Sequence, residues 1–147
     1  MKKISLLVAV TIITVSTLFI SSCAKKADTD LTKDVVGTYV GRETYDIGGS
    51  SNTNPGITFV VSRIDDTHIK LNDPTGSYLD MTATVGAIDD LGDRTFSIMS
   101  FTDGGSIWEP IEGSQGYRPF NRSFFFTVHV TSGSGIGDFF AYEGIKQ

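Results

Sequence analysis

The sequence predicts an all-β domain of eight antiparallel strands, and two observations carry this prediction. From Val35 onward, no window repeats apolar residues at helical spacing without an interrupting glycine or proline. Short runs rich in β-branched and aromatic residues instead alternate with turn residues, which is typical of an antiparallel sandwich or barrel. The expected strands are Val35–Tyr45, Ile57–Ile64, Thr67–Asn72, Ser77–Val85, Arg94–Phe101, Ser106–Ile111, Arg122–Ser132 and Asp138–Ile145.

Turn signals separate these strands. Asp65-Asp66 can form a two-residue hairpin loop, and Asp103-Gly104 is a type I′ turn signal. Asp73-Pro74-Thr75-Gly76 has the residue preferences of a type I turn, and Gly133-Ser134-Gly135 is expected to turn the last hairpin. Longer loops, where binding residues usually lie, are expected at Gly48–Gly56, Gly86–Asp93 and Glu112–Asn121.

The turns also assign side chains to the two faces of the sheet, because paired residues share a face. With Asp65-Asp66 as the loop, Ile64 pairs with Thr67 and faces inward. With Asp103-Gly104 as the turn between the fifth and sixth expected strands, Met99 lies opposite Trp108 on the outer face. The inward stripe of the seventh strand is Phe124, Phe126, Val128 and Val130.

The first 22 residues have the layout of a bacterial secretory signal peptide. A positive start, Met1-Lys2-Lys3, precedes the uncharged run Ile4–Ile20, and small residues then lead to Cys23. The uncharged run is about as short as a membrane-spanning helix can be, so a plain transmembrane anchor is the alternative. We expect a signal peptide over residues 1–22, a flexible linker over 23–34 and one folded domain over 35–147.

The segment Ile20-Ser21-Ser22-Cys23 resembles the lipobox of bacterial lipoproteins. The resemblance implies cleavage before Cys23 and attachment of lipid, including acyl chains such as palmitate, to that residue. Two or three chains make release from the membrane negligible. Ala24 differs from the aspartate associated with inner-membrane retention, which favours the outer membrane in a host that has two membranes.

Composition restricts the function further. Lys2 and Lys3 leave with the signal peptide, so the remaining 125 residues carry 10 basic and 17 acidic side chains, a net charge of −7. This balance argues against nucleic acid as a partner. Cys23 is the only cysteine, which excludes disulfides and Cys-based metal sites in the lipidated chain. We expect a monomer with no cofactor and no metal ion.

The opening of the first strand, Val36-Gly37-Thr38-Tyr39, resembles the Gly-x-Trp opening of lipocalins, with Tyr39 at the tryptophan position. It is closer to the Gly-Thr-Tyr opening of the calycin-like (lipocalin-like) domains of small bacterial lipoproteins. The resemblance covers residues 35–146 and implies a single eight-stranded up-and-down barrel that acts as a binding module. Lys146 is the only candidate for the basic residue that covers the tryptophan position in lipocalins.

Five side chains are candidates for contact with a ligand or partner. Trp108, Met99 and Phe101 could form an apolar outer patch, or they could fill the barrel if their facing is reversed. Tyr117 and Arg118 lie in the predicted loop 112–121, where aromatic and arginine side chains suit recognition, although a plain surface loop explains them equally.

No catalytic constellation is visible in the sequence. His68 and His129 have no partner at metal-ligand spacing, and Ser134 lacks the context of a nucleophile elbow. The acidic cluster of Asp89, Asp90 and Asp93 does not match a calcium loop. We therefore expect a non-enzymatic module that holds a small apolar ligand. The alternative is a structural or protein-interaction lipoprotein of the cell envelope with a filled barrel.

Overall fold

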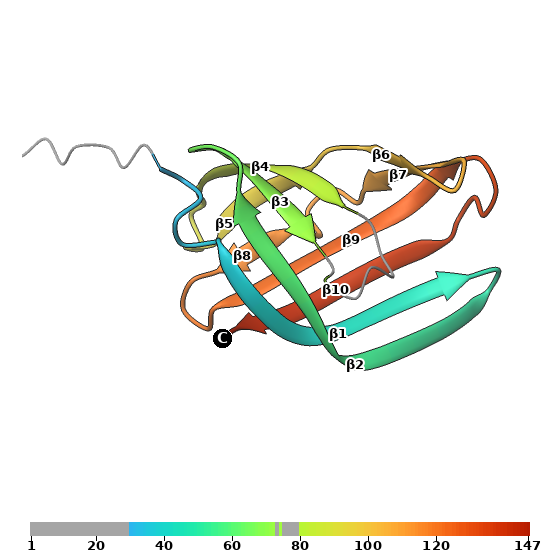
Figure 1. Cartoon of the computed structure of the whole chain (residues 1–147), viewed down its shortest axis with the longest axis horizontal. Coiled ribbons are helices and arrows are strands. Elements are labelled where there is room, and N and C mark those ends of the chain that lie inside the picture. The colour runs from blue at the N-terminus through green and yellow to red at the C-terminus, as the bar shows by residue number, and fades with distance from the viewer. Residues whose placement is uncertain (1–29, 73, 75–79) are drawn as a thin grey trace, which may run out of the picture.

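The computed structural model describes residues 30–72, 74 and 80–147, so Cys23 and the predicted signal peptide lie outside the described residues. Within these ranges the chain is all-β, and no helix is long and apolar enough to cross a membrane. Figure 1 labels the strands, which are β1 (Gly37–Ile47), β2 (Ser50–Arg63), β3 (His68–Asn72), β4 (Met81–Ile88), β5 (Arg94–Ile98), β6 (Phe101–Asp103), β7 (Ser106–Pro110), β8 (Gly116–Arg118), β9 (Ser123–Ser132) and β10 (Phe139–Lys146).

These strands form a closed antiparallel barrel with eight wall positions. β5 and β6 follow one another along one position, and β7 and β8 share the next. One edge of β9 pairs with β8 at residues 123–125 and with β7 at residues 128–132. β10 then pairs with β1 and closes the barrel. Neighbouring wall positions are neighbours in sequence, so the predicted eight-stranded up-and-down barrel is confirmed, with two of its strands broken in the middle.

Two of the predicted loops contain strand instead. β1 and β2 continue to Ile47 and from Ser50, and Gly48-Gly49 alone form the turn, with φ of 59° and 79°. Glycine adopts these positive angles without strain, which suits a type I′ turn. The polar residues of the predicted loop 48–56 therefore pair with the C-terminal half of β1. In the predicted loop 112–121, residues 116–118 form β8.

The β2–β3 register differs by one residue from the predicted one. Arg63 pairs with Ile69, so the connection is one residue longer than the predicted Asp65-Asp66 loop. A slip of one residue exchanges the two faces of a strand. Val61 is consequently buried, whereas Ile64, which was expected to face inward, is 54% exposed.

Aromatic rings fill the middle of the barrel. Phe96 stacks on Phe124 with ring centroids 4.6 Å apart, and Phe124 meets Phe126 at 6.0 Å. Phe126 also lies 5.7 Å from the ring of Phe59 and 5.9 Å from that of Tyr142. All five rings are at most 4% exposed. The predicted inward stripe of β9 is confirmed, since Phe124, Phe126, Val128 and Val130 are all buried.

The two ends of the barrel differ in what they carry. The end that we call proximal holds the first described residue, Asp30, and the C-terminal Gln147 (Figure 1). It also holds the connections at residues 64–67, 89–93 and 119–122. The distal end holds the turns at residues 48–49, 104–105 and 133–138.

Residues 30–34, the last part of the predicted flexible linker, pack on the proximal end. The Leu31 N–H donates a hydrogen bond to the Asp66 carbonyl oxygen at 2.9 Å, and Thr32 is fully buried. The Arg94 guanidinium lies 3.3 Å from the Asp34 carboxylate. The folded domain therefore includes residues 30–34, which have no apolar periodicity and are held by polar contacts to the β2–β3 connection and to Arg94.

Candidate functional site

The predicted outer patch of Trp108, Met99 and Phe101 is not assembled as expected. Gly104-Gly105 form the β6–β7 turn, so Phe101 rather than Met99 lies opposite Trp108. The two rings stack with centroids 6.2 Å apart and planes 4° apart, and both pack against the core. Met99 lies in the break between β5 and β6 and is 45% exposed. Trp108 and Phe101 therefore help to fill the distal part of the barrel.

Tyr117 and Arg118 are neighbours on β8 and point to opposite faces. Tyr117 is buried with its ring edge-on to Tyr39, centroids 6.3 Å apart, and burial raises the pKa of its hydroxyl. The Arg118 guanidinium lies outside, 4.3 Å from the centroid of the Phe125 ring, and its Nε donates to the Asp93 carboxylate at 3.3 Å. Of the two, only Arg118 is placed to meet a partner.

A groove of about 330 Å³ crosses the outer wall over β1, β10 and β9 and reaches Arg118. Arg42 and Glu143 form an ion pair at its rim, with Nη2 and Oε2 3.2 Å apart. Threonine and serine hydroxyls and the small side chain of Ala141 also line the groove. This mixture of guanidinium, carboxylate and hydroxyl groups suits a polar chain segment.

The interior also contains a buried carboxylate. Glu43 is 1% exposed, and its Oε1 accepts a hydrogen bond from Asn54 Nδ2 at 2.7 Å. Its Oε2 is buried with no protein partner, and the same holds for the Trp108 indole nitrogen. Such groups are rare in folded proteins, because a buried polar atom without a partner is costly. Glu43 was not singled out in the sequence, since a lone glutamate in a predicted strand carries no signal.

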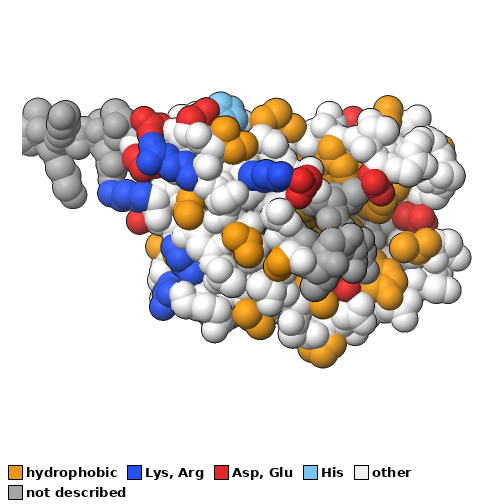
Figure 2. Space-filling view, viewed as in Figure 1, with side chains coloured by type: hydrophobic (Ala, Val, Ile, Leu, Met, Phe, Trp, Pro, Cys, Tyr) orange, Lys and Arg blue, Asp and Glu red, His pale blue; other side chains and the backbone are white. Residues whose placement is uncertain are grey.

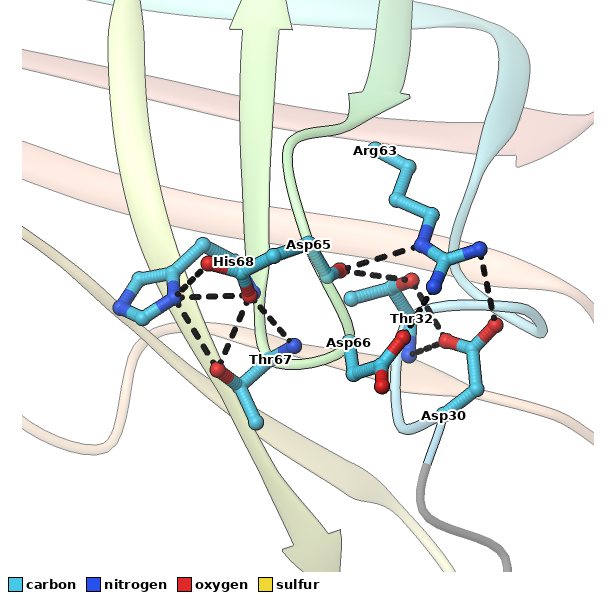
Figure 3. Close-up of polar contacts among 7 residues, drawn as sticks. All are labelled: Asp30, Thr32, Arg63, Asp65, Asp66, Thr67 and His68. Carbon is cyan, nitrogen blue, oxygen red and sulfur yellow. Dashed lines mark hydrogen bonds and ion pairs between the residues drawn. The ribbon is translucent and has the colours of Figure 1, made fainter.

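A polar network holds the β2–β3 turn (Figure 3). The Asp65 carboxylate accepts hydrogen bonds from the N–H groups of Thr67 and His68 at 2.7 and 2.8 Å, and contacts His68 Nδ1 at 2.9 Å. These bonds, that of the Thr67 N–H first, hold the pKa of Asp65 well below its ordinary 3.8. The carboxylate and the Thr67 hydroxyl both contact the same imidazole nitrogen, so they cannot relay a proton through the ring. The network caps a turn.

The same turn receives the N-terminal segment (Figure 3). Arg63 pairs with Asp66 and lies 3.4 Å from the Asp30 carboxylate. The Thr32 hydroxyl donates to Asp30 Oδ1 at 2.8 Å, and this bond is the largest influence lowering the pKa of Asp30. Sequence reasoning missed this contact, although an aspartate two residues before a threonine is a common local turn signal.

Lys146 lies against the beginning of β1. Its side chain packs on Gly37, and its Nζ donates to the Asp34 carbonyl oxygen at 2.9 Å. Burial, followed by the charge of Arg122, lowers the pKa of the Lys146 amine. Tyr39 beneath is fully buried and donates to the Val35 carbonyl oxygen. Lys146 thus ties the last strand to the first.

Asp89 and Ser134, two further candidates for chemistry, act in turns. Asp89 accepts hydrogen bonds from the N–H groups of Leu91 and Asp93, both at 2.9 Å, and the Ser134 carbonyl accepts one from the Ser106 hydroxyl. Among the described residues, no three His, Cys, Asp or Glu side chains come together to hold a metal ion.

Comparison with protein-family models, with curated proteins and with solved structures gave no match. Function is therefore inferred from the side chains and surfaces described above.

Proposed function

We propose that the protein is a lipid-anchored, non-enzymatic lipoprotein of the bacterial cell envelope that binds another envelope protein with the outside of a filled barrel. The observation that carries this proposal is the ring packing inside, where Phe96, Phe124 and Phe126 converge. A carrier of an apolar ligand needs a pocket of roughly 300 Å³ or more. The rings occupy the middle of the barrel, where such a ligand would lie.

Making room for a ligand would be expensive. Each buried phenylalanine contributes on the order of 3–5 kcal/mol relative to alanine, because both its burial and its close packing would be lost. Phe124 touches three other rings, so moving it would disturb the whole cluster. The barrel is therefore best understood as a rigid scaffold for recognition from outside.

The groove beside Arg118 is the surface that we assign to the partner. An exposed ion pair such as Arg42–Glu143 contributes less than about 1 kcal/mol, so either side chain can exchange its present partner for a new one. Arginine is also among the residues that most often dominate binding energy at protein interfaces. A polar or charged polypeptide segment fits this wall.

The anchor part of the proposal rests on the sequence. Cys23 follows a short uncharged run and two serines, as in lipoproteins. Lipid on this residue would place the barrel at an extracytoplasmic membrane surface, and Ala24 favours the outer membrane where there are two.

The test is native mass spectrometry of the protein purified from its own host in mild detergent. We expect a diacylglyceryl mass on Cys23 and a protein bound in fixed stoichiometry. Arg118→Glu should remove that protein, whereas Thr84→Glu, on the exposed outer face of β4, should retain it. A stoichiometric apolar molecule in place of a protein, or equal retention by the two variants, would refute the proposed mode of binding.

A second candidate function follows from Glu43 and Trp108. The Glu43 Oε2 atom has no protein partner and can accept a hydrogen bond from a small polar ligand, and the Trp108 Nε1 atom can donate one. Such a ligand would appear as a defined added mass in the same spectra. The mass should be absent from Glu43→Gln and present in the Arg118→Glu variant.

A further inference from the structure

Three loops at the proximal end each expose a large apolar side chain. Leu91 in the β4–β5 loop is 87% exposed, Phe120 in the β8–β9 loop is 83% exposed, and Ile64 in the β2–β3 connection is 54% exposed. These loops are distant in sequence, and the up-and-down topology brings them to one end. Scattered apolar residues on a surface need no explanation, but apolar tips on separate loops at one end suggest a shared contact.

The short distance along the chain from Cys23 to this end indicates that the contact is with the membrane. Asp30 is fixed to the proximal end by Arg63, and Cys23 precedes it by seven residues. Seven residues span at most about 25 Å when fully extended. A lipid on Cys23 would therefore hold the proximal end within about 25 Å of the bilayer.

Charge favours the same orientation. On the face in Figure 2, Lys and Arg side chains lie toward the proximal end and the middle, whereas acidic side chains also occur at the distal end. Arg122 follows Phe120 by two residues, and its guanidinium is exposed at the proximal end, bonded to the Gln147 carbonyl oxygen. The distal stretches 43–56, 99–113 and 130–141 contain acidic residues and no Lys or Arg. The proximal end carries basic and acidic side chains in similar numbers, so an anionic membrane surface repels it less than it repels the distal end.

We propose that the proximal end rests on the membrane that holds the Cys23 lipid, with Leu91 and Phe120 inserted at the bilayer interface. This inference rests on the proposed lipid anchor. Asp89 and Asp90 stand beside Leu91 and must stay in water, so insertion is limited to the loop tips. The barrel then stands on its end, and the groove on its side wall faces the aqueous space.

Site-specific labelling of the lipidated full chain tests the orientation. Because Cys23 is the only cysteine and its thiol carries the lipid, single cysteines can be labelled uniquely with an environment-sensitive dye. The variants are Leu91→Cys and Phe120→Cys, with Ile136→Cys, 71% exposed on a distal turn, as the matched control. All three side chains are exposed, so the substitutions should not disturb folding. The protein is reconstituted in vesicles of phosphatidylethanolamine and phosphatidylglycerol, some with brominated acyl chains.

We expect dye quenching by the brominated chains to be several-fold stronger at positions 91 and 120 than at 136. Equal quenching at the three positions, or quenching only at 136, would overturn the inference. The mass of the same sample reports the lipid on Cys23. A lipidated protein without quenching at 91 and 120 refutes the docking and leaves the proposed function intact.

If Cys23 carries no lipid, the anchor proposal fails and vesicle flotation of the unlipidated chain decides the docking. Replacing Leu91 and Phe120 together by serine should then weaken vesicle binding about tenfold or more, since exposing apolar side chains of this size weakens partitioning by that order. Equal vesicle binding by the wild type and the double variant, or no binding by either, would overturn the inference.

Discussion

The Tyr142 hydroxyl joins three strands inside the barrel, and its removal is the sharpest test of the fold. The side chain is 2% exposed on β10, and the hydroxyl reaches the carbonyl oxygens of Tyr39 on β1, at 3.0 Å, and Ile57 on β2, at 3.2 Å. It can do so because the ring lies over Gly144, where any side chain would overlap the phenol. Tyr142→Phe removes one donor that the buried carbonyl of Tyr39 and the partly buried carbonyl of Ile57 share.

The expected cost follows from those contacts. A net buried hydrogen bond is worth about 1 kcal/mol, and leaving a buried acceptor without its donor raises the loss to about 1–3 kcal/mol. We expect Tyr142→Phe to lower the free energy of unfolding by about 1–2 kcal/mol. For a domain of this size, an unfolding entropy of about 2 cal/mol/K per residue converts that loss into a drop of roughly 4–8 °C in Tm.

Urea and thermal unfolding followed by circular dichroism measure this loss. Tyr45→Phe is the control, because Tyr45 is only partly buried, faces the same interior and forms no hydrogen bond through its hydroxyl among the described residues. It should change stability by less than about 0.5 kcal/mol. Equal effects of the two substitutions would refute the role assigned to the Tyr142 hydroxyl.

Four further outcomes are expected. In Gly41→Ala, the new methyl group would overlap the backbone carbonyl oxygen of Glu143, so urea unfolding should reveal a loss of about 3 kcal/mol or more. Gly48→Ala has open space around it and only its φ of 59° against it, and should lose about 1 kcal/mol. The pKa of Asp65 is lower in the folded than in the unfolded chain. The stabilisation by its carboxylate is therefore present above about pH 4 and is lost as the pH falls through the folded pKa. On acidification, the urea midpoint of Asp65→Asn should fall less than that of the wild type. In Thr32→Val, the loss of a buried hydroxyl bonded to an aspartate should speed amide hydrogen exchange over residues 31–36 and leave β9 unchanged; uniform acceleration of both regions would contradict a local role for Thr32.

Features that depend on one strand or one turn could be predicted from the sequence. The β9 stripe was predicted correctly because strict alternation over a long strand fixes its inward face. The eight wall positions were also predicted correctly, because hairpin turns mark where each strand ends. The strand pattern alone allowed a sandwich or a barrel, and the resemblance at Gly37-Thr38-Tyr39 implied the barrel.

Features that depend on strand register or on closure of the barrel could not be predicted from the sequence. One extra residue in the β2–β3 turn reversed the face of Ile64, and one glycine pair in place of Asp103-Gly104 moved Phe101 opposite Trp108. Tyr117 looked like a loop residue because the strand that holds it has only three residues. The outer groove combines side chains from β1, β8, β9 and β10, so it exists only after the barrel has closed.

The place of β1 in the barrel determines how the fold meets mechanical force. β1 pairs along one edge with β10 and along the other with β2, and it begins at the end from which the chain leads toward Cys23. Tension on the chain that precedes β1 would therefore pull β1 along its own axis and load both rows of hydrogen bonds in shear, many at a time. The contacts of Asp30 with Arg63 and Thr32 precede that strand in the chain and would break first. Such a pull would thus release several residues from the proximal end before the barrel itself bears the load.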